Sequence, residues 1–218
     1  VLTGSGLRGT RFFPEVRLNF AENLLRIAGN TTALAGISEA RDDQECSFDD
    51  LRMLVGTVQR QLHEQGIEIG DRIAAFMPNI PETVIAVLAT SAAGAIWSSC
   101  SPDFGTQSVV DRFEQIEPKL LFCVNGYVHN GQVIDCRSKL VELGARLPSL
   151  RMMVVIELVD LPIDTLEVEN FVLWDEWIND EQAEPNYERL PFDHPLYIMY
   201  SSGTTGKPKC IVHGAGGT

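Results

Sequence analysis

Short apolar runs alternate with amphipathic segments along most of this 218-residue chain, and this alternation limits its possible folds more than any other feature. Apolar residues recur with helical spacing at 47–65, 79–93, 106–116 and 137–147. The apolar runs between or after these segments are 73–77, 95–97, 120–124 and 152–156. Because strands that alternate with helices pair in parallel through crossover connections, the sequence predicts an α/β fold with a mostly parallel sheet flanked by helices.

Residues at the ends of the first two helical segments match the preferences of helix termini. Ser47 and Asp50 have the spacing of a capping box, and Gly66 suits the left-handed position after a helix. Pro81 fits the first turn of the next helix, which is expected to stop at Gly94. These local signals indicate helices at both segments.

The composition excludes several classes of protein. Apolar residues make up 44% of the chain and charged residues 22%, which allows a real core and argues against disorder. Seventeen basic and thirty acidic residues give a net charge of −13, so neither nucleic acid nor an anionic membrane is expected as a partner. The most apolar stretch, 83–97, is too short to span a bilayer.

The cysteines and the two chain ends bear on the cellular setting. Five cysteines, without a Cys-x-x-Cys pair, argue against a disulfide scaffold and zinc and favour a reducing cytosol. Residues 1–15 lack the continuous apolar core of a signal peptide. The chain begins with Val1 and ends in GAGGT, which suggests a piece of a longer protein.

Charge is distributed unevenly along the chain. Residues 157–188 contain eleven carboxylates and no Lys or Arg, which we interpret as a solvated surface excursion, with Trp174 and Trp177 as surface or packing residues. Residues 194–218 contain Lys207 and Lys209 and no acidic residue. A bound anion is therefore expected in this last window.

Residues 4–9 match the dinucleotide-binding pattern GxGxxG, but in the wrong context. The pattern needs a strand before it and a helix after it, whereas here only three residues precede it and Pro14 follows closely. We therefore predict a flexible leader and no dinucleotide site.

Residues 200–209, YSSGTTGKPK, carry the chemistry of a phosphate-binding loop. Gly203 and Gly206 allow backbone amides to converge on one point, hydroxyls add donors, and lysine supplies a positive charge. The Walker A form is excluded, because only two residues separate the glycines and Pro208 follows Lys207. The alternative is an ordinary hairpin loop between the apolar runs 196–199 and 210–212.

The loop sequence resembles the phosphate-binding signature of the adenylate-forming enzymes, which include acyl-CoA synthetases. Two further stretches, 17–25 and 94–105, resemble the acetyl-CoA synthetase branch and, within it, the acetoacetyl-CoA synthetase family. With 211–214, the resemblance extends over nearly the whole chain from about Phe12 onward. It implies the N-terminal part of the large domain of that fold, with a lead segment at 1–45 and an incomplete AMP-binding domain at 46–218.

The resemblance implies a ligase that activates acetoacetate with ATP and Mg²⁺ and transfers the acyl group to coenzyme A. Lys209 would be the catalytic loop lysine. The phosphate-binding residues would be Ser201, Ser202, Gly203, Thr204, Thr205, Gly206 and, with less weight, Lys207. The adenine and ribose contacts, the hinge, the C-terminal lysine and most of the acyl pocket would lie beyond Thr218, so no turnover is expected from this chain alone.

Three questions stay open at this point. The acid could instead be acetate or propionate, and the chain could be a non-catalytic fragment that only binds ATP or a partner. Trp97 and 98–101 could shape a substrate surface or simply pack, and Cys100 is a poor nucleophile because no base is evident. His213 is interpreted as structural, and because Gln132 stands where related synthetases can present basic residues, no CoA contact is assigned.

Overall fold

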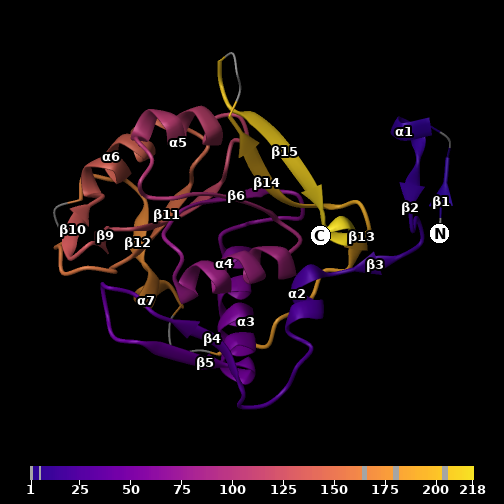
Figure 1. Cartoon of the computed structure of the whole chain (residues 1–218), viewed down its shortest axis with the longest axis horizontal. Coiled ribbons are helices and arrows are strands. Elements are labelled where there is room, and N and C mark those ends of the chain that lie inside the picture. Colours follow the sequence, from indigo (N-terminus) through magenta and orange to yellow (C-terminus); the bar gives the residue numbers. More distant parts are fainter. Residues whose placement is uncertain (1, 5, 164–165, 179–181, 203–205) are drawn as a thin grey trace.

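One seven-stranded sheet organises the molecule, for which the computed structural model describes residues 2–4, 6–163, 166–178, 182–202 and 206–218 (Figure 1). Neighbouring strands are parallel except for the last pair, which is antiparallel. In their order across the sheet, the strands are β12 (Phe171–Leu173), β11 (Met152–Ile156), β8 (Leu120–Val124), β6 (Arg72–Phe76), β7 (Ile96–Cys100), β14 (Pro195–Ser201) and β15 (Lys209–Gly214). The predicted α/β class is confirmed.

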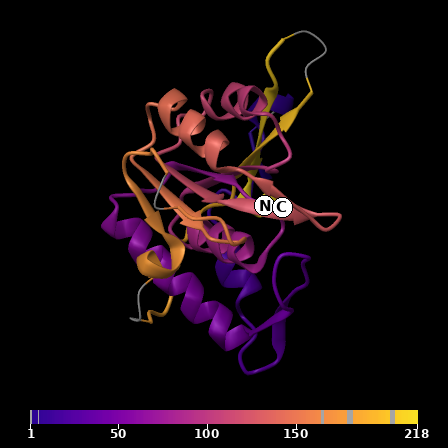
Figure 2. The same cartoon turned by 90° about the vertical axis from the view of Figure 1, so that its left-hand side faces the viewer.

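Helices cover both faces of the sheet (Figure 2). Alternate side chains of the strands are buried beneath them. One face packs against α3 (Phe48–Glu64), α4 (Pro81–Ala92) and α7 (Trp174–Ile178). The other packs against α5 (Thr106–Phe113) and α6 (Arg137–Arg146). Successive side chains of a strand point to opposite faces, so Ile73 and Ala75 of β6 join the first core while Ala74 and Phe76 join the second.

The helix ends agree with the sequence signals. The Ser47 hydroxyl accepts a hydrogen bond from the Asp50 amide at 3.1 Å, and the Asp50 carboxylate accepts one from the Ser47 amide at 3.4 Å. Gly66 and Gly94 have φ angles of 69° and 73°, as glycines after helices often do. The helix expected at 106–116 stops at Phe113, because the chain turns there and Glu117 adopts a φ of 47°.

Smaller elements surround the sheet. They include β1 and η1 near the two termini, and β9 and β10, which form an antiparallel hairpin. They are β1 (Leu2–Thr3), α1 (Gly6–Gly9), β2 (Arg11–Phe12), β3 (Arg17–Leu18), α2 (Phe20–Leu24), β4 (Thr32–Gly36), β5 (Gln44–Ser47), β9 (Gly126–His129), β10 (Gln132–Asp135), β13 (Leu190–Pro191) and the 3-10 turn η1 (Ala215–Gly217). The boundary proposed between residues 45 and 46 falls inside β5. The division into a lead segment and a second domain stays a prediction.

The leader predicted at the start of the chain has local secondary structure, and its flexibility stays a prediction. β1 and β2 pair there, with Leu2 opposite Phe12 and Thr3 opposite Arg11. The intervening α1 has only four residues, and a two-residue strand precedes it. A single short turn of helix offers little of the dipole that the dinucleotide pattern requires, which supports rejecting that motif.

The acidic window is more than a surface excursion, which corrects the sequence interpretation. It contains β12, which extends the main sheet, and α7, whose Trp174 and Trp177 are each only 5% exposed. The rings of these two residues lie 5.9 and 5.6 Å from the Phe122 ring in β8. The window therefore closes one end of the core, and both tryptophans are packing residues. No helix in the described ranges is long and apolar enough to cross a membrane.

Candidate active site

The predicted phosphate loop joins β14 to β15 at the edge of the sheet (Figure 1). These strands form a hairpin in which Ser201 pairs with Lys209 and Tyr200 with Cys210. β14 runs parallel to β7, so both strands present their carboxyl ends on the same side. Ligands of open α/β sheets bind outside the carboxyl ends of the strands, which makes this edge the candidate site.

The structure places most of the predicted loop residues at the two shoulders of this hairpin. Ser201 ends β14 half-buried, and Ser202 after it is exposed. Gly206 has a φ of 106°, a conformation that glycine adopts readily, and Lys209 opens β15 with an exposed side chain. The predicted Gly203, Thr204 and Thr205 lie outside the described residues.

The two loop lysines have different surroundings. Lys207 forms an ion pair with Glu114, and the hydrogen bond that its ammonium donates to that carboxylate raises the pKa of Lys207. Lys209 has no ion-pair partner within the described ranges of the chain. Lys209 is therefore the loop cation whose charge is not already balanced by a neighbouring acid.

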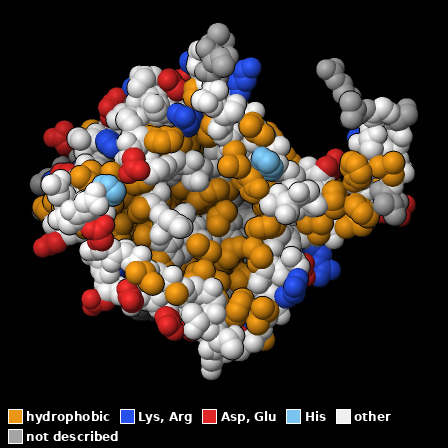
Figure 3. Space-filling model, viewed as in Figure 1, with side chains coloured by type: hydrophobic (Ala, Val, Ile, Leu, Met, Phe, Trp, Pro, Cys, Tyr) orange, Lys and Arg blue, Asp and Glu red, His pale blue; other side chains and the backbone are white. Residues whose placement is uncertain are grey.

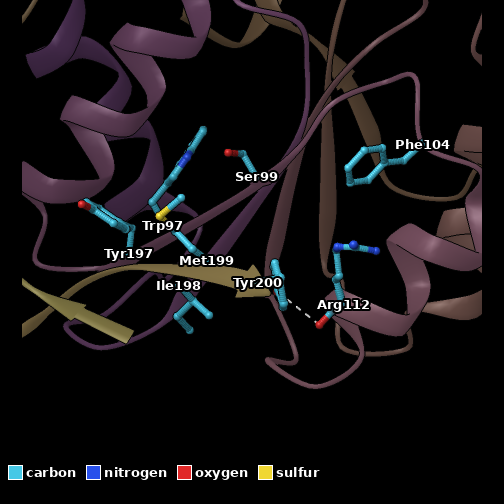
Figure 4. Close-up of a pocket in the computed structure, with 8 residues that line it drawn as sticks. All are labelled: Trp97, Ser99, Phe104, Arg112, Tyr197, Ile198, Met199 and Tyr200. Carbon is cyan, nitrogen blue, oxygen red and sulfur yellow. Dashed lines mark hydrogen bonds between the residues drawn. The ribbon is translucent and has the colours of Figure 1, made fainter. Parts of the chain in front are cut away.

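A cleft of about 370 Å³ lies between β7, β14 and α5, next to this hairpin (Figure 4). Trp97 and Ser99 come from β7 and line the cleft, whereas Ser98 and Cys100 of the same run are buried. The residues that line the cleft are Trp97, Ser99, Phe104, Arg112, Tyr197, Ile198, Met199 and Tyr200. Figure 3 shows apolar side chains around a hollow on this face, with Lys or Arg side chains close to the hairpin.

Arg112 gives the cleft a fixed positive charge. Its guanidinium carbon lies 4.8 Å from the Phe104 ring centre and 5.7 Å from the Tyr200 ring centre. The Tyr200 hydroxyl donates to the Arg112 carbonyl oxygen at 3.2 Å and accepts from the Ser98 hydroxyl at the same distance. Burial raises the pKa of Tyr200, so its hydroxyl stays protonated at neutral pH.

The sequence reasoning missed Arg112, Phe104 and Tyr200. Arg112 looks like an ordinary polar position on an amphipathic helix, and its stacking partners come from two other segments. The one available signal was the position of Phe104, four residues beyond a strand end in an α/β pattern. Only the folded sheet brings these three residues together.

Cys100 and His213, which the sequence also singled out, have no catalytic role that the structure supports. Burial raises the pKa of Cys100 to about 12, so the thiolate needed for nucleophilic attack is scarce at neutral pH. The His213 ring lies 5.0 Å from the Tyr197 ring, beside the cleft. Across the described part of the chain, no group of three or more His, Cys, Asp and Glu side chains could hold a metal ion.

Comparisons with known proteins confirm the resemblance. The family model for AMP-binding enzymes matches residues 22–218. Acetoacetyl-coenzyme A synthetase of Rhizobium meliloti (strain 1021) is 50% identical over 219 residues, which cover 100% of this chain and 34% of that protein. Malonamoyl-CoA synthetase vrtB of Penicillium aethiopicum is 38% identical over 220 residues, which cover 95% of this chain and 30% of that protein.

The fold comparison agrees with the sequence comparison. The structure of acetoacetyl-CoA synthetase from Streptomyces lividans superposes with a TM-score of 0.92 at 42% identity. The match covers 100% of this chain and 33% of that one, so the chain spans about a third of the length of its relatives. This chain belongs to the AMP-binding enzyme family.

Proposed function

We propose that the complete protein is an AMP-forming acetoacetate–CoA ligase. In the first half-reaction, a carboxylate oxygen of acetoacetate attacks the α-phosphorus of ATP and pyrophosphate leaves. In the second, the thiol of coenzyme A attacks the acyl carbon and AMP leaves. The observation that carries the proposal is the serine- and glycine-rich hairpin at the carboxyl edge of the sheet, in a chain 50% identical to an acetoacetyl-coenzyme A synthetase.

The hairpin has the chemistry to bind the departing phosphates. Negative charge builds on the β- and γ-phosphates as pyrophosphate leaves, and amides, hydroxyls and a lysine stabilise it there. We assign this role to 201–206, with Lys209 as the cation that acts in the transition state. Its ammonium has no ion-pair partner among the residues that the structure describes, which supports this choice over Lys207, whose charge is partly balanced by Glu114.

Magnesium fits this site as a companion of the nucleotide. Mg²⁺ in nucleotide sites is commonly held by substrate phosphates and one or two carboxylates rather than by a protein cage. Among the described residues no group of three or more His, Cys, Asp and Glu side chains could hold the ion, so the nucleotide would have to supply most of its ligands. The ion would supply further charge neutralisation on the phosphates.

Four short acids are candidates for the substrate that is activated, and acetoacetate is the first of them. Malonamate is a second candidate, because a malonamoyl-CoA synthetase is 38% identical to this chain. Malonamate and acetoacetate are both short β-carbonyl acids and differ only by an amino group in place of a methyl group. Acetate and propionate lack the β-carbonyl and are the weaker alternatives.

ATP–pyrophosphate exchange by the complete protein tests both the reaction and the acid. Acetoacetate should support the fastest exchange, followed by malonamate, with acetate and propionate far slower. Fastest exchange with malonamate would change the substrate but keep the reaction. No exchange with any of the four acids would contradict the ligase assignment and favour a non-catalytic fragment.

We also propose that the protein works in a reducing compartment, the cytosol. All five cysteines are free in the structure, and Cys100, Cys123 and Cys136 are buried in the core. A buried free thiol persists where thiols are kept reduced. Localisation of a fluorescent fusion of the complete protein tests this, and signal confined to a secretory compartment would refute it.

A further inference from the structure

The carboxyl end of α5 contacts the chain directly after the phosphate loop. Gln115, two residues beyond α5, donates a hydrogen bond from Nε2 to the carbonyl oxygen of Pro208 at 3.0 Å. The Cys210 thiol lies 3.8 Å from Gln115 Oε1 and points its weak donor at that oxygen. The same Nε2 also donates to the Asp111 carbonyl oxygen at 2.6 Å, which ties the amide to its own helix.

Pro208 and Cys210 are the two neighbours of Lys209, so Gln115 contacts the chain on either side of that lysine, through the Pro208 carbonyl oxygen and the Cys210 thiol. Lys209 is also fixed across the hairpin by its pairing with Ser201. Side chains alternate along a strand, so the Lys209 side chain leaves the face opposite Cys210 and does not compete for Gln115. The origin of the lysine stem is thereby set by contacts on three sides.

We infer that Gln115 is a positioning residue for Lys209. The inference rests on the proposed role of Lys209 and adds a residue that touches neither nucleotide nor acid. A lysine stem has four rotatable bonds, so the position of its backbone decides where the ammonium can reach at low entropic cost. Gln115 suits this role because its side-chain amide has both a donor and an acceptor. A hydrocarbon side chain could not donate a hydrogen bond to the Pro208 carbonyl oxygen.

Beyond the hairpin, the Gln115 amide bonds to the Asp111 carbonyl oxygen of α5, and this contact would be lost with the side chain. The Gln115 side chain is exposed, so replacing it buries no polar group and opens no cavity. The adjacent Glu114 is different, because its carboxylate pairs with Lys207 and a charge change there would alter the field around the loop. Gln115 is therefore the cleaner residue for a test.

The experiment compares Gln115→Leu with the matched control Gln107→Leu in the complete protein. Gln107 lies on the same helix, and its amide contacts Asp111 and Arg146 instead of the hairpin. Of the three contacts that Gln115→Leu removes, those with Pro208 and Cys210 reach the hairpin, and the Cys210 thiol is a weak donor, so about one full hydrogen bond to the hairpin is lost. One hydrogen bond corresponds to about a two- to tenfold change in an equilibrium or rate constant. In ATP–pyrophosphate exchange, Gln115→Leu should therefore lower kcat about two- to tenfold with little change in the KM for ATP, while the control stays at the wild-type rate.

A double-mutant cycle with Lys209→Ala separates positioning from general damage. If Gln115 acts through Lys209, Gln115→Leu has no further effect once Lys209 is Ala. An equal effect in both backgrounds, or a wild-type rate for Gln115→Leu, would overturn the inference. If Lys209→Ala itself exchanges at the wild-type rate, the assigned role of Lys209 is wrong instead.

Discussion

Replacing Lys209 with Ala should slow adenylate formation without unfolding the protein. The side chain is exposed and has no ion-pair partner among the described residues, so its loss removes no packing from the core. A hydrogen bond to a charged group contributes about 1.5–3 kcal/mol, which corresponds to a roughly ten- to a hundredfold loss of rate. We expect this loss in the kcat of ATP–pyrophosphate exchange with acetoacetate, with a smaller change in the KM for the acid.

Lys207→Ala is the matched control for this prediction. It removes the same kind of side chain two residues away, but the Lys207 ammonium is already paired with Glu114 and the Lys207 side chain is 63% exposed. Exposed ion pairs contribute about 0–1 kcal/mol, so the loss of rate should stay below about fivefold. A larger loss for Lys207→Ala than for Lys209→Ala would show that the two roles were assigned to the wrong lysines.

Three further predictions concern the fold. Ser47→Ala removes the hydroxyl that caps α3 and should lower the free energy of unfolding by about 0.5–2 kcal/mol in urea titrations, whereas an unchanged midpoint would contradict the capping geometry. Phe122→Ala empties a fully buried site among three tryptophans and should cost about 3–5 kcal/mol by the same measurement; a loss below about 1 kcal/mol would show a poorly packed core. Burial raises the pKa of Cys100 from 9.0 to about 12 and that of Cys136 to about 11, so their contribution to stability is complete below pH 9 and is lost as the pH rises above 9 toward those values. Urea titrations on both sides of pH 9 test this, and a Cys100→Ala, Cys136→Ala variant with the same pH dependence would refute it.

The helices and central strands were predictable because their signals are local. A capping residue, a glycine after a helix and the spacing of apolar residues act within a few positions, and α3 and α4 follow them closely. β8 and β11 have the bounds that the sequence predicts, because strands buried on both faces are continuous apolar runs. β7 extends three residues further than its apolar run, since Ser98 is buried through a hydrogen bond to the carbonyl oxygen of Ile198 at 2.9 Å, a partner a hundred positions away.

The elements that the sequence did not reveal depend on distant contacts. β12 and α7 lie in a strongly acidic window, where the charge pattern obscures two tryptophans that complete the core. The residues of the candidate site likewise fall into a group that the sequence reveals and a group that it does not. Its glycines, hydroxyls and lysines are contiguous and form a readable motif, whereas Arg112 and Gln115 belong to the site only because α5 packs beside the hairpin.

Three cations, Arg112, Lys207 and Lys209, lie near the carboxyl edge of β14. Their surroundings differ in how far each positive charge can move and how far it is neutralised. The Arg112 guanidinium is stacked on two rings, so its charge has a fixed position inside the cleft. Lys207 is held by Glu114, and its attraction for an anion is reduced by that carboxylate. Lys209 has a backbone held by its neighbours and a flexible stem whose ammonium lacks an ion-pair partner among the described residues, so in the proposed reaction we expect it to follow the departing phosphates. A cation accelerates a reaction only as far as it interacts more strongly with the transition state than with the ground state, and that is the effect we expect of Lys209 on the departing phosphates.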